Sequence, residues 1–252
     1  MPLFQKEGLM LYCPSNAYKK VNNTFGKLYL TRAPVIGIIG TSKQQGKFTI
    51  QLQLRKKFQK MGYAVGQLGT EPTAPLFGMD EVYPIGYNGL NQSDLISLLE
   101  ESNYLIHSID VKKPDIIIAG SQSGFIPKGY YNSGQIPLSQ LAFMLGVNPD
   151  AVILCMNVDD SPEYVSRAIY GVESLCNCKV IGIAVYPLTY ANGWGIIRSK
   201  KSKTTDEHVQ KTIDYLERTY HIPVVVTGEK SNEDKLIQSC LHYFSGGFNE
   251  QI

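Results

Sequence analysis

Short apolar runs rich in Val and Ile alternate with segments of helical periodicity through most of the chain. Runs of this length with few polar positions are typical of strands that are buried on both faces of a sheet. We expect strands at 35–39, 64–68, 115–119, 151–156, 180–185 and 224–226, and helices at 46–61, 94–111, 138–145, 163–175, 206–220 and 232–244. This alternation predicts an α/β fold with a mostly parallel sheet covered by helices on both faces.

The first thirty-odd residues fit this alternation poorly. Residues 26–30 favour a small strand, and the residues before them an arm or a hairpin. We therefore divide the chain into an N-terminal arm or small hairpin, residues 1–33, and one α/β domain, residues 34–252. Parallel sheets of this kind bind ligands at the carboxyl ends of their strands. The segments that follow the strands are therefore the places to search for function.

The segment after the first strand carries the main chemical signal. It reads GTSKQQGKFT over residues 40–49, a polar loop between an apolar strand and a helix that Gly46 and Lys47 open. Glycines let backbone N–H groups turn toward an anion, and the helix N-terminus adds its dipole. Lys47 adds a full positive charge, as in phosphate-binding loops (P-loops). The predicted contacts to a bound nucleotide or nucleotide-like cofactor are Gly40, Thr41, Ser42, Lys43, Gly46, Lys47, Phe48 and Thr49.

The loop departs from the pattern G-x-x-x-x-G-K-[ST] in two ways. One extra residue separates the two glycines, and Phe48 takes the position of the hydroxyl that normally binds Mg²⁺. Thr49 supplies that hydroxyl if the helix begins slightly differently, with Thr41 and Ser42 as further candidates. Thr49 is accordingly one predicted Mg²⁺ ligand.

Three other residues of the loop have less definite roles. Lys43 is a second cation that either reaches a phosphate or lies in solvent. Gln44 and Gln45 are expected to contribute backbone N–H groups only, with no role for their side chains.

Composition and charge exclude several other classes. A net charge of +2 gives no support to general nucleic-acid binding. The sequence shows neither an apolar run long enough to span a bilayer nor a signal peptide, so we expect a cytoplasmic protein without membrane contacts. The five cysteines do not form a disulfide pattern, and Cys176 and Cys178 are either a C-x-C metal pair or buried thiols at a helix-to-strand turn.

Four segments in order resemble the P-loop domain of domain-of-unknown-function family 1611. They are the loop at 40–49, the turn Gly69-Thr70-Glu71, the segment 114–124 with Pro127 and Tyr130 after it, and the segment 148–155. The family loop, roughly G-T-D-x-x-x-G-K-x-T, has the same length and does not require a hydroxyl residue after lysine, whereas Ser42 replaces the family's usual Asp. The resemblance covers about residues 34–245. More distantly the chain resembles dethiobiotin synthetase, and it is similar to proteins encoded beside clostridial peptide-maturation systems.

The resemblance implies a three-layer P-loop NTPase fold of the SIMIBI type, in which homodimers often form across the nucleotide face. It also implies that the family's usual N-terminal Rossmann-like domain is missing or reduced to a short arm. Related enzymes carry a carboxylate at the end of the third strand, whereas this chain has Gly120 there. Glu71 is then the best carboxylate facing the loop and the second predicted Mg²⁺ ligand, with Asp159 and Asp160 next, although Asp160 is equally explained as a helix cap.

Three functions are compatible with these residues. The first is an ATP-dependent enzyme that activates or phosphorylates a small molecule or peptide, with Lys47 and Glu71 as catalytic residues and Mg²⁺ as cofactor. Its substrate side would be the loops 121–131 and 186–198, with Gln122, Ser123 and Tyr130 as substrate contacts. The second is an N-acyltransferase that places the pyrophosphate of acetyl-CoA in the loop without a metal, as the resemblance permits. The third is a non-catalytic, degenerate P-loop partner in a natural-product or peptide-maturation pathway.

Overall fold

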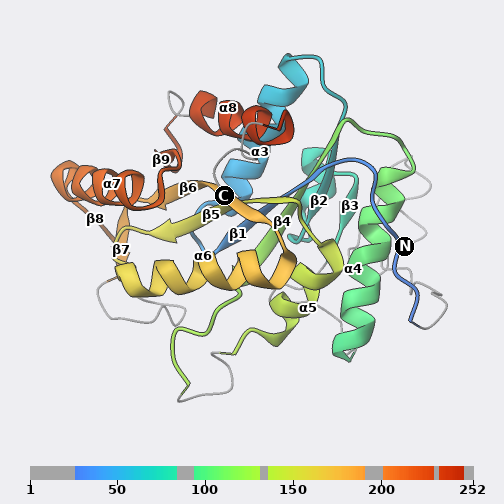
Figure 1. Cartoon of the computed structure of the whole chain (residues 1–252), viewed down its shortest axis with the longest axis horizontal. Helices are drawn as coiled ribbons and strands as arrows, with labels where there is room; N and C mark the ends of the chain where they lie inside the picture. The colour runs from blue at the N-terminus through green and yellow to red at the C-terminus, as the bar shows by residue number, and fades with distance from the viewer. Residues whose placement is uncertain (1–25, 84–93, 131–135, 191–200, 230–232, 247–252) are drawn as a thin grey trace, which may run out of the picture.

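The computed structural model of the chain describes residues 26–83, 94–130, 136–190, 201–229 and 233–246. Within these ranges seven strands form one sheet in the order β3-β2-β4-β1-β5-β6-β9, and every neighbouring pair is parallel (Figure 1). The strands are β1 (Val35–Gly40), β2 (Val65–Gly69), β3 (Glu81–Val82), β4 (Ile116–Gly124), β5 (Ala151–Asn157), β6 (Lys179–Tyr186) and β9 (Val224–Val226). The predicted parallel sheet is confirmed.

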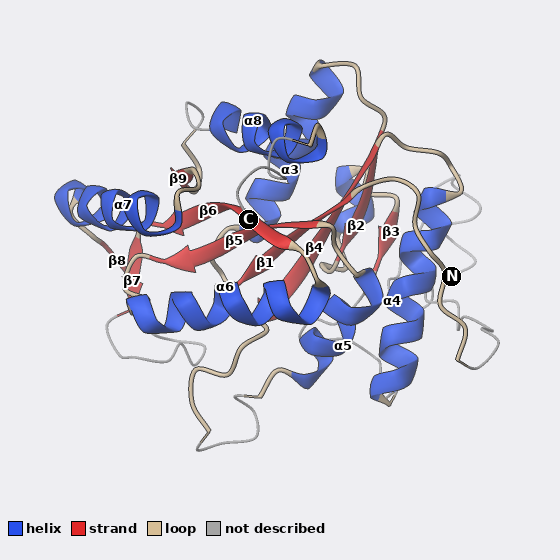
Figure 2. Cartoon of the chain, in the orientation of Figure 1, coloured by secondary structure: helices blue, strands red, loops and turns tan. Residues whose placement is uncertain are grey.

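Helices cover both faces of this sheet, which gives the three layers (Figure 2). One face packs against α3 (Lys47–Lys60) and α8 (Glu233–Phe244). The other packs against α4 (Leu95–Asp110), α5 (Leu138–Val147), α6 (Pro162–Cys176) and α7 (Asp206–Tyr220). Burial on both faces explains why the strands are almost uninterrupted apolar runs.

The order of the strands places the phosphate loop at the centre of the sheet. β1 lies between β4 and β5, with Gly40 paired to Cys155 on one side and to Gly124 on the other. The loop that leaves Gly40 therefore meets the ends of two strands that are distant in sequence. This is the carboxyl edge where ligands bind in parallel sheets.

Some elements were not predicted, and one expected element is absent. A 3-10 helix, η1 (Ala74–Phe77), follows β2, and two short strands, β7 (Leu188–Tyr190) and β8 (Lys201–Lys203), form an antiparallel pair. Part of the predicted loop 186–198 is thus β7, and residues 191–200 lie outside the described ranges. The expected strand at 26–30 is wrong, because residues 27–30 have no strand partner there.

Three further sequence expectations concern the N-terminal arm, membrane-spanning helices and the cysteines. The predicted arm or hairpin before residue 26 lies outside the described residues. In the ranges that the structure describes, no helix has both the length and the apolar character needed to cross a membrane. The four cysteines in these ranges, Cys155, Cys176, Cys178 and Cys240, are buried free thiols.

Candidate functional site: a phosphate loop with a buried brace

The loop after β1 turns through two residues with positive φ. Gln44 has a φ of 60° and Gly46 a φ of 78°, and α3 begins directly afterwards at Lys47. A Cβ atom on residue 46 would lie 2.2 Å from Cγ2 of Thr227, so a side chain there meets both a steric clash and an unfavourable backbone conformation. The two left-handed residues accommodate the extra residue between the glycines while α3 still opens on Gly-Lys.

Lys47 is buried at the start of α3, with only 5% of its surface exposed. Its Nζ donates a hydrogen bond of 2.6 Å to the carbonyl oxygen of Ser42 across the loop. Burial lowers the pKa of Lys47 to about 8, while the thiol of Cys155 and the carboxylate of Glu71 act in the opposite direction. A buried cation with few anionic partners favours an anionic ligand, since such a ligand restores the charge balance.

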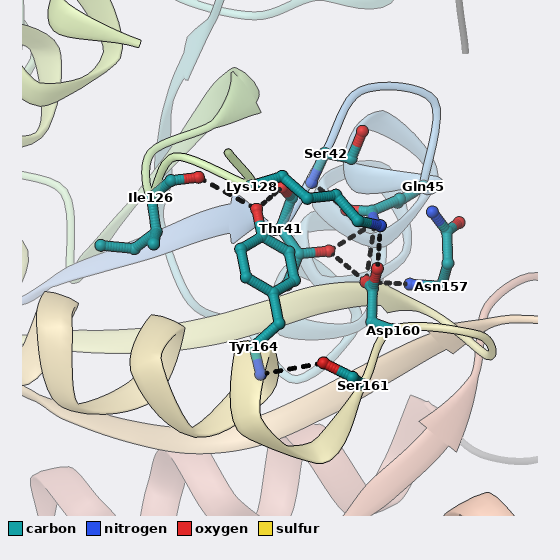
Figure 3. Close-up of polar contacts among 9 residues, drawn as sticks. All are labelled: Thr41, Ser42, Gln45, Ile126, Lys128, Asn157, Asp160, Ser161 and Tyr164. Carbon is teal, nitrogen blue, oxygen red and sulfur yellow. Dashed lines mark hydrogen bonds and ion pairs between the residues drawn. The ribbon is translucent and has the colours of Figure 1, made fainter. Parts of the chain in front are cut away.

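The carboxylate of Asp160 holds the loop from below (Figure 3). Its Oδ2 accepts hydrogen bonds from the hydroxyl of Thr41 at 2.5 Å and from the backbone N–H of Asn157 at 2.9 Å. Its Oδ1 lies 3.1 Å from Nζ of Lys128, and the Asp160 side chain is 1% exposed. The sequence left Asp160 open between a site carboxylate and a helix cap. The cap of α6 is instead the neighbouring Ser161, whose hydroxyl accepts from the N–H of Tyr164.

Gln45 supports the loop together with Asp160. We call these two residues, with Lys128 and Tyr164, the brace. The residue is fully buried, and its Oε1 accepts the backbone N–H of Ser42 at 2.9 Å. Its Nε2 donates to the hydroxyl of Thr41 at 2.6 Å, and this places the amide beside Asp160 (Figure 3). The expectation that the Gln45 side chain has no role is therefore wrong. Its carboxamide satisfies loop groups that would otherwise be buried without partners.

Tyr164 connects the loop to the segment after β4. Its hydroxyl lies 2.8 Å from the carbonyl oxygen of Thr41 and 3.0 Å from that of Ile126. Burial raises the pKa of Tyr164, and the neighbouring carboxylate of Asp160 raises it further. The phenol therefore stays protonated and keeps its donor proton over the physiological pH range.

The positions where P-loop enzymes hold a metal are occupied differently here. Phe48 packs its ring against Phe77 of η1, with the ring centroids 5.1 Å apart and the rings nearly perpendicular. Thr49 is exposed on α3. The expectation that Gly120 ends its strand is wrong, because β4 continues to Gly124. At Gly120 a Cβ atom would lie 1.8 Å from Nε2 of Gln51, so the Gln51 carboxamide fills the space beside the middle of the strand.

Of the residues predicted to bind substrate or metal, Glu71 and Gln122 contact each other, whereas Ser123 and Tyr130 have other partners. Glu71 and Gln122 come together, because Nε2 of Gln122 donates to Oε1 of Glu71 at 2.9 Å. Ser123 makes a long contact of 3.3 Å to the carbonyl of Gly124. Tyr130 is 69% exposed, and its hydroxyl contacts Arg167 of α6 at 3.1 Å instead. The assigned roles of these residues stay predictions.

Comparison with known families identifies the domain. The profile of the P-loop domain of a domain of unknown function, DUF1611, matches residues 24–237. The chain belongs to this family. No curated protein sequence matches the chain.

Solved structures agree with the DUF1611 assignment. A DUF1611 family protein from Anabaena variabilis ATCC 29413 is similar over 86% of this chain, with 14% sequence identity and a TM-score of 0.62. The match covers 62% of that protein's chain, so the present chain spans less than two thirds of its relative. Cobyrinic acid a,c-diamide synthase from Mycobacterium smegmatis, solved with an ATP analogue and magnesium, is similar over 86% of this chain and 97% of its own, with 10% identity and a TM-score of 0.51. At such identities the likeness shows the fold, which is that of P-loop nucleotide-binding proteins.

Sequence reasoning missed most of the brace beneath the DUF1611 loop. Gln45, Lys128 and Tyr164 carried no motif, and their roles arise from contacts between segments far apart in the chain. One signal was available for Asp160, because it follows β5 at the carboxyl edge and is next to an independent helix cap, Ser161.

Proposed function

We propose that this DUF1611 domain binds ATP, with the phosphates in the loop at 40–49, and uses it to modify a small molecule or a peptide. The observation that carries the proposal is the buried ammonium of Lys47, which faces a loop opened by Gly46 at the N-terminus of α3. Two sources of positive potential, the cation and the helix dipole, converge on one place. A polyphosphate is the ligand that compensates both.

Two buried polar atoms support a nucleotide beyond its phosphates. Oδ1 of Asn157 at the end of β5 and Oγ1 of Thr227 after β9 have no hydrogen-bond partner among the described residues. Thr227 also packs directly against Gly46 of the loop. Unpaired polar atoms at strand ends near the phosphate loop are suited to the polar edge of a base or a ribose.

A cavity of about 450 Å³ beside the brace is a place for the acceptor substrate. It lies between the start of α6 and α7, and its lining is largely apolar but includes Asp159, His208 and Lys211. Asp160 lines this cavity and also accepts a hydrogen bond from Thr41. The Asp160 side chain therefore connects an occupant of the cavity to the phosphate loop. Its size suits a small molecule or the end of a peptide.

A second function, that of a nucleotide-holding partner without catalysis, is favoured by a different observation. Phe48 lacks the metal-binding hydroxyl, and β4 carries no carboxylate from Ile116 to Gly124; P-loop enzymes use both groups for transfer. Binding without turnover in the presence of candidate acceptors would support this function over the first. Acetyl-CoA is the alternative cofactor, with no support from the ATP-analogue complex named above.

Calorimetric titration of the purified chain with ATP, ADP, GTP and acetyl-CoA, with and without Mg²⁺, tests the proposal. We expect ATP and ADP to bind and acetyl-CoA not to bind. Lys47→Ala should remove at least about 3 kcal/mol of binding free energy, since a charged hydrogen bond and a buried counter-charge are lost together. Lys60→Ala, at the exposed end of the same helix, is the matched control. Equal affinity in the two variants would defeat the proposal.

The assembly and the location of the protein are predictions that rest on the family resemblance and the sequence alone. A homodimer across the nucleotide face would appear in light scattering as twice the mass of 28.0 kDa. Fractionation of cells would test the expected cytoplasmic location.

A further inference from the structure

Lys128 is the most exposed member of the brace, and several contacts fix its position. Its Nζ lies 3.1 Å from Oδ1 of Asp160 and 5.4 Å from the ring centroid of Tyr164, so the ammonium faces a carboxylate and an aromatic ring (Figure 3). Its backbone is held two residues earlier, where the hydroxyl of Tyr164 lies 3.0 Å from the carbonyl oxygen of Ile126. The Lys128 side chain is 40% exposed and that of Asp160 is 1% exposed, so this ion pair joins the surface to the interior.

Asp160 brings a negative charge close to the cation of the phosphate loop. Its Oδ2 accepts the hydroxyl of Thr41 and lies 3.4 Å from Nε2 of Gln45. The other end of the same carboxamide is near Lys47, because a Cβ atom on residue 40 would lie 2.7 Å from Oε1 of Gln45 and 2.9 Å from Nζ of Lys47. Gln45 is therefore a near neighbour of both the carboxylate and the ammonium.

A carboxylate at this place has two opposite effects on an anionic ligand. It orients the loop, because the hydroxyl of Thr41 and the backbone N–H of Asn157 both donate to it. It also repels a polyphosphate, and these neutral donors do not remove its charge. Lys128 supplies a compensating positive charge at 3.1 Å. With that lysine in place the pair is neutral, and Asp160 does not reduce the positive potential of Lys47.

We propose that Lys128 is a positioning residue for polyphosphate binding, which neutralises Asp160 so that this carboxylate can shape the phosphate loop without repelling the ligand. The inference rests on the proposed binding of a nucleotide. Lys128 acts here through Asp160 and needs no contact with the phosphates. Because Coulomb repulsion is proportional to the charge of the ligand, the loss of affinity on removing Lys128 grows with the number of phosphate charges.

The test is a calorimetric titration of the full chain with ADP and with ATP, both in EDTA so that no metal ion changes the ligand charge. Lys128→Met keeps a long side chain and removes its charge. We expect about a tenfold loss of affinity for ADP and about a twentyfold loss for ATP, because the two losses in free energy follow the ligand charges. Lys128→Arg should retain the native affinity for both ligands.

Lys112→Met is the matched control for the loss of a lysine charge. Lys112 follows α4 and forms an ion pair of 3.2 Å with Asp80, so it is a paired surface lysine like Lys128 but has no contact with the brace. This variant should bind ADP and ATP as the native chain does.

The double variant Lys128→Met/Asp160→Asn shows how Lys128 acts. Asparagine keeps an oxygen that accepts from Thr41 and from the N–H of Asn157, but it carries no charge that needs a partner. This variant should bind ADP within about threefold of the native chain, and therefore more tightly than Lys128→Met alone. A double variant as weak as Lys128→Met would overturn the inference, since that is the result expected of a lysine that only supports the fold. Equal losses for ADP and ATP in Lys128→Met would overturn it as well.

The inference and the proposed function fail in different ways. No binding of ADP or ATP to the native chain would defeat the proposed function together with this inference. Native ADP binding that Lys128→Met leaves unchanged would overturn the inference alone, while the nucleotide site stands.

Discussion

The hydroxyl of Thr41 donates a hydrogen bond of 2.5 Å to the carboxylate of Asp160, which is 119 positions away in the sequence. This bond joins the start of the phosphate loop to the turn that follows the neighbouring strand β5. The same carboxylate also receives the N–H of Asn157 and the ammonium of Lys128. The loop is therefore held in shape by the protein before any phosphate binds.

The first prediction concerns Asp160 itself. Asp160→Ala should lower the free energy of unfolding by about 2–3 kcal/mol, because several donors lose a shared, charged and buried acceptor. Asp159→Ala is the control. Its carboxylate is 46% exposed and pairs with His208 at 3.5 Å, so its loss should cost no more than about 0.5 kcal/mol. Urea unfolding measures both, and equal losses would show that Asp160 has no special structural role.

The second prediction separates Gln45 from its neighbour Gln44. Gln45→Leu removes the acceptor for the N–H of Ser42 and the donor to Thr41, so the loop loses its fixed shape. We expect ADP affinity to fall about tenfold, the effect of about 1.4 kcal/mol. Gln44→Asn should bind normally, because Gln44 is exposed and asparagine tolerates its positive φ. Normal binding by Gln45→Leu would contradict the role of the brace.

The third prediction concerns pH. The pKa of Lys47 is lowered to about 8 by burial, and a bound polyphosphate favours the charged form and raises that pKa again. Binding therefore takes up a proton above pH 8, and the Kd for ADP should rise up to about tenfold per pH unit there. Calorimetry in buffers of different ionisation enthalpy at pH 8.5 would measure the uptake. An uptake of zero at that pH would contradict a pKa of Lys47 that is lowered in the free protein and raised by the bound ligand.

The same shift in the pKa of Lys47 has a consequence for stability. The folded state releases the lysine proton at a lower pH than the unfolded state, whose pKa is near the ordinary 10.5. Between about pH 8 and 10.5 the unfolded chain holds more protons at this residue, so this one contribution to stability rises with pH. Comparing the native chain with Lys47→Met in urea at pH 7.5 and 9.5 would isolate it.

The fourth prediction is a double-mutant cycle at Gly46. Gly46→Ala should destabilise the fold strongly, because the new Cβ would lie 2.2 Å from Cγ2 of Thr227 and φ is 78°. Thr227→Ser removes that methyl group, so the double variant should recover the part of the loss due to the clash. The backbone part, about 1–2 kcal/mol, should persist. Strictly additive single effects would show that Thr227 does not limit residue 46.

Much of the fold could be predicted because its strands are buried on both faces. The run at 151–156, for example, has no polar position that would permit another environment, and it is found in β5. The short strands β7 and β8 could not be predicted, since three residues are too few to show alternation.

The site could be predicted as far as its local chemistry extends. Gly46 and Lys47 predict a phosphate loop, because the strand, the glycine, the lysine and the helix follow one another directly in the sequence. The structural role of the Gln45 side chain could not be recognised, since a glutamine in a loop is equally compatible with exposure to solvent. The sequence shows that Gly120 replaces the carboxylate of related enzymes. It cannot show that the side chain of Gln51 fills the space beside this glycine.

The position of β1 between β4 and β5 also determines when the site can form. Thr41 needs Asp160 and Tyr164, and β1 needs both neighbours, so each of these contacts closes a chain segment of more than seventy residues. Contacts of such long range are made late in folding, after local helices are in place. A nascent chain that has not yet emerged past α6 therefore has the loop sequence without the loop's shape. A ligand that needs the shaped loop would then stabilise only forms in which the segments from β1 to α6 have come together.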